Sequence, residues 1–324
     1  MTKPAELSTS LPTFAAEGPD DWSHLIEFAR AADQAGFDRL VMSDHIVFGE
    51  HLDAYGDPSN GGSRGGRQPT GPDGSWLEPL ATIAHLTALT TRARFASNIL
   101  VAALRRPVAL AKTAATIDVL SGGRLDLGVG VGWQREEYEA AGLSFEGRGR
   151  LLNHTIEVCQ ALWQNQTASY DSPELSFADI HQMPKPTQPG GVPIWVSGTV
   201  NPRSMDRLAR YGSGWIPWGD DAADIEAGIA RMRSAVADRD RDPGDLGVVG
   251  TLRAVKGDDG ALDLEQTMEP VPKLYQAGVT DFRIALKPPR GEQAAVEYLS
   301  PVVTAFRARA EGWTGVASIT RHYG

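Results

Sequence analysis

A chain of 324 residues can hold one large α/β barrel or two ordinary domains, and 41% hydrophobic residues suffice for a sizeable core. The formal net charge of −10 argues against a nucleic acid or an anionic membrane as a partner. We expect neither a spanning helix nor a signal peptide, because no long apolar run or basic-then-apolar start is present. The single cysteine, Cys159, cannot form an internal disulfide, so a cytoplasmic location is the default expectation.

Strand-like and helix-like segments alternate along the whole chain. The expected strands are 6–11, 39–43, 94–100, 124–129, 193–197, 214–217, 247–255 and 280–286. The expected helices are 19–36, 77–90, 107–120, 134–141, 148–163, 202–211, 222–238, 264–277 and 292–310. Eight strand–helix units in one unbroken chain predict a (β/α)8 TIM barrel. A doubly wound parallel sheet is the alternative.

Two segments interrupt this alternation. Residues 49–75 are rich in Gly, Pro, Asp and Ser, and such long loops tend to be lids or binding loops. Residues 168–190 contain several prolines and are interpreted as an inserted, extended excursion. Neither segment has the composition of a domain linker, so we expect a single domain over residues 1–324.

The most informative stretch runs from Ser121 to Trp133, where a strand ends in glycines at every second position. On a strand this spacing puts Gly128, Gly130 and Gly132 on one face. A dinucleotide fingerprint would need its third glycine at position 133 or 135, and these are Trp133 and Arg135. Close strand packing is one interpretation of the glycines. The one we favour is a flat ring that lies against Gly130 and Gly132, at the strand end where barrels place their sites.

Metal and hydrolase chemistry find little support in the sequence. The seven histidines form no His-x-x-x-His pair, and there is no cysteine cluster, so no metal site is expected. No Gly-x-Ser-x-Gly elbow is present either.

Three further runs carry a family resemblance together with the glycine stretch: Arg106-Pro107-Val108, Asp118-Val119-Leu120-Ser121-Gly122-Gly123-Arg124 and Pro193-Ile194-Trp195-Val196-Ser197-Gly198. In combination they resemble the bacterial-luciferase-like superfamily. The resemblance implies a (β/α)8 barrel with an insertion, and FMN or the deazaflavin coenzyme F-420 at its mouth. Flavin members are usually monooxygenases, whereas deazaflavin members transfer a hydride to or from a small organic substrate. It also implies a homodimer.

The pair Asp44-His45 ends the second strand at the barrel mouth. An imidazole there can exchange protons near neutral pH, although a structural histidine is an even alternative. The resemblance implies that both residues line the coenzyme ring in the deazaflavin branch, with His45 beside the reactive carbon. Coenzyme F-420 is therefore the first expectation, and FMN is the alternative.

Other candidates follow from neighbouring strand ends. The resemblance implies that Ser97-Asn98 supports the ring through a bulge or a cis peptide, whereas Asn98 could simply cap the strand. Some deazaflavin dehydrogenases have a catalytic glutamate where this chain has Trp133, which argues against a sugar-phosphate dehydrogenase. Glu136, three residues later, could reach the ring or only cap its helix.

A third candidate region is the helix start after the fifth strand. Ser197-Gly198-Thr199 lies there, and free N–H groups at a helix N-terminus bind anions. The phosphate of the coenzyme is the expected occupant, and Arg203 could add positive charge or remain a surface residue.

Overall fold

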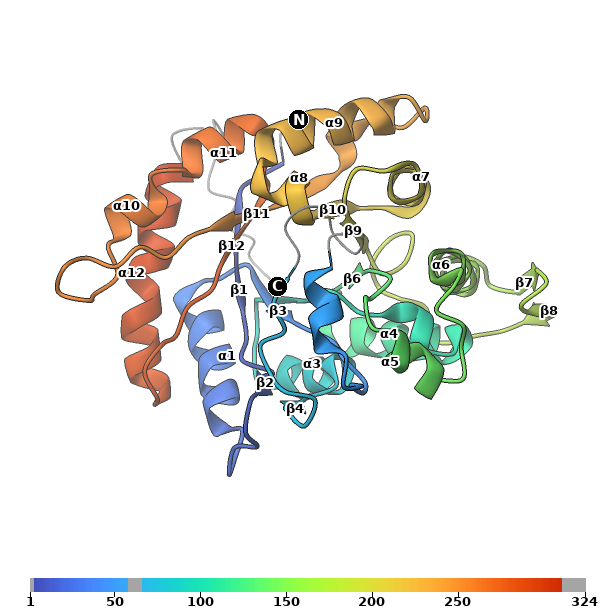
Figure 1. The fold of residues 1–324 in the computed structure, drawn as a ribbon, viewed down its shortest axis with the longest axis horizontal. Coiled ribbons are helices and arrows are strands. Elements are labelled where there is room, and N and C mark those ends of the chain that lie inside the picture. The colour runs from blue at the N-terminus through green and yellow to red at the C-terminus, as the bar shows by residue number, and fades with distance from the viewer. Residues whose placement is uncertain (1–2, 58–65, 311–324) are drawn as a thin grey trace, which may run out of the picture.

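The computed structural model describes residues 3–57 and 66–310. Eight parallel strands close into a barrel in the order β1-β12-β11-β10-β9-β6-β5-β3, with helices around it (Figure 1). The strands are β1 Glu6–Ser10, β3 Arg39–Met42, β5 Arg94–Ser97, β6 Leu125–Val129, β9 Ile194–Gly198, β10 Gly214–Pro217, β11 Gly247–Leu252 and β12 Asp281–Ile284. The predicted TIM barrel is confirmed, and the doubly wound sheet was wrong.

The helices mostly match the expected ranges. They are α1 Ser23–Ala35, α3 Pro79–Thr87, α4 Pro107–Ser121, α5 Arg135–Ala140, α6 Arg148–Gln164, α7 Pro202–Tyr211, α8 Gly219–Ala223, α9 Ile225–Ala237, α10 Leu264–Met268, α11 Val271–Ala277 and α12 Glu292–Ala310. The predicted helix 222–238 is divided because Asp224 caps a new helix start through Ala227 N–H. The predicted helix 264–277 is divided at Pro270, which has no N–H to continue the ladder.

The two irregular segments also contain structure. Within 49–75 lie a 3-10 helix, η1 Leu52–Gly56, and the strand β4 Ser75–Trp76, which pairs with β2 Phe14–Ala15; residues 58–65 lie outside the described part. The excursion 168–190 contains an antiparallel hairpin, β7 Ala168–Asp171 and β8 Ser176–Ile180. Two short 3-10 helices, η2 Ala102–Leu104 and η3 Pro243–Asp245, complete the elements.

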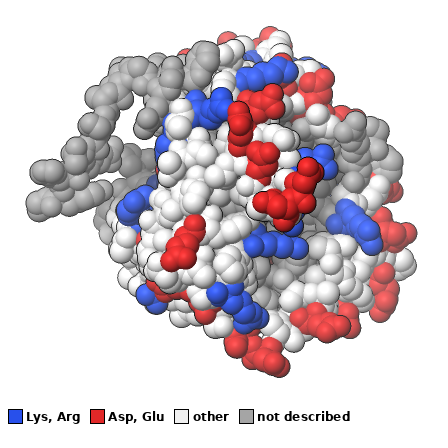
Figure 2. All heavy atoms as spheres, turned by 90° about the vertical axis from the view of Figure 1, so that its left-hand side faces the viewer, with Lys and Arg blue, Asp and Glu red and all other residues white. Residues whose placement is uncertain are grey.

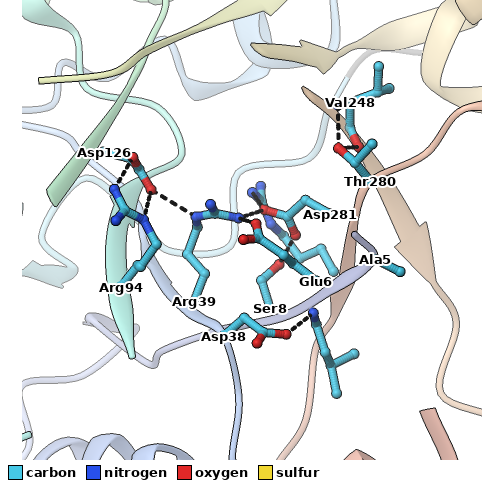
Figure 3. Close-up of polar contacts among 12 residues, drawn as sticks. Ala5, Glu6, Ser8, Asp38, Arg39, Arg94, Asp126, Val248, Thr280 and Asp281 are labelled. Carbon is cyan, nitrogen blue, oxygen red and sulfur yellow. Dashed lines mark hydrogen bonds and ion pairs between the residues drawn. The ribbon is translucent and has the colours of Figure 1, made fainter. Parts of the chain in front are cut away.

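A buried ionic layer fills the amino-terminal end of the barrel (Figure 3). Arg39, the first residue of β3, contacts Asp126, Asp281 and Glu6 from three other strands. Arg94 adds a second contact to Asp126 at 2.6 Å. Burial alone would raise the pKa of Asp126, but the two guanidinium groups hold it below its ordinary value. The layer therefore consists of charges that neutralise one another.

An indole ring packs against this layer. The Arg39 guanidinium lies 5.1 Å from the centroid of the Trp195 ring. A Cβ added at Gly214 or Gly247 would lie 2.3 Å or 2.5 Å from that ring, so both glycines make room for it. Trp195 therefore packs between Arg39 and the two glycine positions, whereas a cavity lies at the carboxyl ends of the strands.

The outer surface carries mixed charge on the face drawn in Figure 2. Basic and acidic side chains are interspersed there, and the basic ones form no continuous patch. No helix among the described residues is long and apolar enough to cross a bilayer.

Candidate active site

A cavity of about 360 Å³ opens at the carboxyl ends of the barrel strands. Its lining residues are Phe14, Ser43, Asp44, His45, Tyr55, Arg67, Gln68, Pro69, Trp76, Asn98, Ile99, Val101, Gly130, Val131, Gly132, Trp133, Ser197, Gly198 and Trp218. These come from strand ends far apart in the sequence, because parallel strands of a barrel end at the same mouth. Eight of the twelve predicted site residues are therefore brought together: Asp44, His45, Asn98, Gly130, Gly132, Trp133, Ser197 and Gly198.

His45 follows strand β3, and its ring contacts one carboxylate and three aromatic side chains. Its Nδ1 lies 3.3 Å from Oε2 of Glu137. Ring centroids of Phe48, Trp76 and Trp133 lie 4.5, 5.0 and 5.7 Å from the imidazole. No described residue partners the other ring nitrogen, Nε2, so this atom is the one that can serve a ligand in the cavity.

Asp44 lines the cavity, but its carboxylate is engaged by the protein. It accepts from Val101 N–H at 2.9 Å and from two nitrogens of Arg105 at 2.7 and 3.0 Å. Arg105 also contacts Glu78. Asp44 thus ties the end of β3 to the loop after β5, and this fixes the start of the segment that carries His45.

Glu136 does not line the cavity. Its carboxylate contacts the exposed His51, and its side chain packs against Gly49. The neighbouring Glu137 is 1% exposed and contacts His45 instead. Successive residues on a helix point about 100° apart, so only one of two adjacent glutamates can face the barrel. No helical pattern marked Glu137 in the sequence, because Trp133 precedes the N-cap Gln134 and α5 itself has only six residues.

The glycines in and just after β6 make room for the segment at the end of β5. A Cβ at Gly128 would lie 2.1 Å from the Ser97 carbonyl oxygen, and one at Gly130 would lie 2.6 Å from Ile99 Cδ1. Gly132 has φ +68° and faces Val101. Close packing therefore explains Gly128. Gly130 and Gly132 line the cavity by their backbone, while Ile99 and Val101 occupy the space beside them and form part of its wall.

The chain after β5 takes an unusual course at this wall. The peptide bond between Asn98 and Ile99 is cis. Ser97 is fully buried, and its Oγ donates to the Gly128 carbonyl at 2.9 Å, so Ser97 supports the wall without lining the cavity.

The amino terminus of α7 is largely satisfied by its own residues. Asn201 Oδ1 accepts from Ser204 N–H at 3.0 Å, and Ser204 Oγ donates to the Thr199 carbonyl. Pro202 at the first helical position has no N–H to offer. Thr199 and the exposed Arg203 do not line the cavity, unlike Ser197 and Gly198.

Aromatic side chains form the outer part of the cavity. Tyr55 of η1 lies with its ring centroid 5.1 Å from that of Trp133 and 5.7 Å from that of Trp218. Across the mouth, Phe14 stacks on Trp76 at 4.4 Å. Tyr55 thus joins η1 to residues that follow β6 and β10, and the Phe14–Trp76 pair joins β2 to β4, so the mouth is walled by flat apolar surfaces.

The described residues form no cluster of metal ligands at the cavity. Within residues 3–57 and 66–310, no group of three or more His, Cys, Asp or Glu side chains is placed to hold a metal ion.

Comparison with known proteins assigns the chain to a family. The profile of the family described as luciferase-like monooxygenase matches residues 5–299, so the chain belongs to that family. An uncharacterized protein of Mycobacterium tuberculosis is 28% identical over 283 residues, which are 85% of this chain and 88% of that protein. The F420-dependent hydroxymycolic acid dehydrogenase of Mycobacterium tuberculosis is 27% identical over 241 residues, which are 73% of this chain and 60% of the dehydrogenase.

Solved structures agree on the fold. An F420-dependent secondary alcohol dehydrogenase in complex with an F420-acetone adduct has a TM-score of 0.72 at 17% identity, over 95% of this chain and 100% of its own. The long-chain alkane monooxygenase LadA has a TM-score of 0.74 at 14% identity, over 100% of this chain and 94% of its own. Luciferase-like family members are oxidoreductases or monooxygenases, and this chain has the same barrel fold.

The donors of the cavity fit a flat heteroaromatic ring. Nε1 of Trp133 and Nε2 of Gln68 are buried and have no hydrogen-bond partner among the described residues, and both residues line the cavity. An unsatisfied buried donor costs about 1–3 kcal/mol, so a ligand acceptor at either atom is favourable. Flavin and deazaflavin rings both carry carbonyl oxygens that accept hydrogen bonds. The residues present thus fit the coenzymes that the sequence analysis anticipated.

Proposed function

We propose that this chain is an oxidoreductase that transfers a hydride between coenzyme F-420 and a small organic substrate. The observation that carries the proposal is His45, whose Nδ1 is held by a buried carboxylate while the ring lines a flat-walled cavity. Hydride transfer to or from an alcohol or carbonyl also moves one proton, and a fixed imidazole can take or give it. The sequence similarity to an F420-dependent dehydrogenase of Mycobacterium tuberculosis supports this choice of coenzyme.

The residues of the cavity have distinct tasks in this proposal. The deazaflavin, when bound, supplies a ring carbon that accepts or donates the hydride. Ile99, Gly130, Gly132 and Trp133 would hold the ring, and the aromatic mouth would exclude water from it. Ser197 and Gly198, with Thr199 and Arg203 beyond them, are proposed to face the phosphorylated tail. His45 would hold the mobile proton at Nε2.

The walls also favour a class of substrate. Phe14, Tyr55, Trp76 and Trp218 present ring faces rather than charges to the outer cavity. Ring faces bind flat or apolar groups better than sugar phosphates. We therefore propose an organic substrate with an apolar portion and one oxidisable or reducible carbon.

A second candidate function is an FMN-dependent monooxygenase that uses reduced flavin and oxygen. It is supported by the family description and by the structural similarity to an alkane monooxygenase. A protein that only binds the coenzyme and does not turn it over is a third possibility from another class.

Titration of the purified protein with each coenzyme tests the proposal. We expect micromolar binding of F-420, followed by fluorescence, and much weaker binding of FMN. Micromolar FMN binding without F-420 binding would reverse this choice.

A stopped-flow measurement then tests the chemistry. His45→Ala should slow oxidation of the reduced coenzyme by substrate by at least about 10²-fold, the lower end of general acid–base contributions, with little change in coenzyme Kd. An unchanged rate removes His45 from the mechanism, and absence of any turnover with the wild type favours a carrier.

A further inference from the structure

Glu137 is a buried carboxylate without a guanidinium or ammonium partner among the described residues. Its side chain is 1% exposed, and its single ion-pair contact is with His45. Its Oε1 accepts from Ile46 N–H at 2.6 Å, and its Oε2 faces His45 Nδ1 at 3.3 Å. Both oxygens are thus committed to two consecutive residues of the segment after β3. A charge so deeply buried is retained at a cost, which points to a role beyond packing.

A carboxylate beside His45 decides which of the two ring nitrogens carries the proton. An ionised carboxylate only accepts hydrogen bonds, so the nitrogen that faces it must be the protonated one. In neutral His45 this makes Nδ1 the donor and leaves a lone pair on Nε2. We propose that Glu137 is a positioning residue that fixes the Nδ1–H tautomer of His45 and so presents Nε2 to the cavity as a proton acceptor. The catalytic consequence rests on the proposed function, whereas the tautomer does not.

No other charged group of the described residues contacts His45 Nδ1. Asp44, its neighbour in the chain, gives both oxygens to Arg105 and the Val101 amide. Glu136 of the same helix contacts His51, and Glu78 contacts Arg105. The remaining neighbours of the ring are the aromatic side chains of Phe48, Trp76 and Trp133. Nδ1 therefore has one partner, and that partner sets the tautomer.

The Ile46 amide makes the substitution Glu137→Gln unusually informative. The Ile46 N–H needs an acceptor, and the carbonyl oxygen of a glutamine would remain on it. The amide NH2 would then face His45 Nδ1 and donate to it. In neutral His45 the proton would move to Nε2, and the cavity would meet a donor instead of an acceptor. Replacement of one carboxylate oxygen by an amide nitrogen thus inverts the tautomer of His45 without changing the size of the side chain at position 137.

The experiment is 15N NMR of protein labelled at histidine, recorded at a pH where His45 is neutral, with its signals assigned by their loss in His45→Ala. Wild type should show Nδ1–H, Glu137→Gln should show Nε2–H, and Glu137→Asp should restore Nδ1–H if the shorter carboxylate still reaches the ring. Glu136→Gln is the matched control and should keep Nδ1–H. An Nδ1–H tautomer that persists in Glu137→Gln would overturn the proposal. If Glu137→Gln does not fold, an Nε2–H tautomer in the wild type overturns it equally.

Kinetics separate this inference from the proposed function. In the direction that removes a proton from substrate, Glu137→Gln should lower kcat by at least about tenfold, since a wrong tautomer of a catalytic histidine is known to be costly. KM and the F-420 Kd should stay within about twofold, because general acid–base groups act mainly on the chemical step. An inverted tautomer with an unchanged kcat would leave the positioning role intact and would refute the role of His45 in turnover.

Discussion

At the scale of single residues, two adjacent glutamates hold two histidines of one short segment. Glu137 contacts His45 inside the cavity, and Glu136 contacts His51 outside it. The hydrogen bond and charge of Glu136 raise the pKa of His51 above 6.5, and the same contact lowers the pKa of Glu136 below 4.5. The outer pair thus joins the start of the mouth loop to α5, in a manner that depends on pH.

The sign of that dependence follows from the two shifts. The contribution of His51 is fully present below its unfolded value of 6.5 and is lost as the pH rises through its raised folded value. The contribution of Glu136 is present above 4.5 and is lost as the pH falls through its lowered folded value. We expect the free energies of unfolding of wild type and His51→Gln, measured with urea, to differ most between pH 4.5 and pH 6.5. The two values should converge in alkaline solution. The difference should be small, because His51 is exposed.

The cavity residues at the strand ends could be predicted from the sequence, whereas those from the loops could not. His45, Asn98, Gly130 and Trp133 each lie at or just beyond the end of a barrel strand, and the carboxyl ends of barrel strands meet at one mouth. Glu137 was missed because α5 is only six residues long and has too few apolar positions to show its inner face. The anion site expected at α7 remains a prediction, whereas the local capping by Asn201 and Ser204 was not foreseen, because helix position alone does not reveal it.

At the scale of elements, the aromatic ring of Tyr55 packs the short helix η1 against the barrel mouth. Tyr55 lies between Trp133 and Trp218, and burial raises the pKa of its hydroxyl. No described residue partners that hydroxyl, so the ring rather than the oxygen makes the contact. Tyr55→Ala should therefore release η1, whereas Tyr55→Phe should not.

Fluorescence quenching can measure this release without a known substrate. Trp133 is 8% exposed in the folded protein. Acrylamide quenching of tryptophan fluorescence should increase in Tyr55→Ala and remain at the wild-type level in Tyr55→Phe. Each aromatic pair is worth about 0.5–1.5 kcal/mol, which is enough to shift a loop but not to unfold the barrel. Equal quenching in all three proteins would show that Tyr55 does not hold the loop.

At the scale of the whole molecule, stability depends on the ionic layer that joins five strands at the barrel's amino-terminal end. Although burial alone would lower the pKa of Arg39, the carboxylates of Asp281, Asp126 and Glu6 raise it well above its ordinary value. Arg39→Met would leave these acids buried without their shared cation. We expect a loss of about 3–5 kcal/mol in the free energy of unfolding, measured with urea.

A surface pair provides the control for that measurement. Arg30 contacts Glu292 at 3.0 Å, and its side chain is 45% exposed. Arg30→Met should cost no more than about 1 kcal/mol, because solvent screens such pairs. Equal losses in the two variants would mean that the ionic layer contributes no more than a surface contact.

The barrel itself was predictable because eight strand-like segments alternate with helical ones, while the ionic layer was not. Its members stand at strand starts separated by tens of residues, and each alone resembles an ordinary surface charge. Only closure of the barrel brings Glu6, Arg39, Asp126 and Asp281 to the same depth. Long-range charge pairing depends on topology, which local patterns do not encode.

The cavity lies at the carboxyl ends of the barrel strands, with Tyr55 and Trp218 among its lining residues. In the proposed function, coenzyme and substrate would both occupy this pocket. The molecule that lies deeper would then bind first and leave last, so ordered binding kinetics are expected.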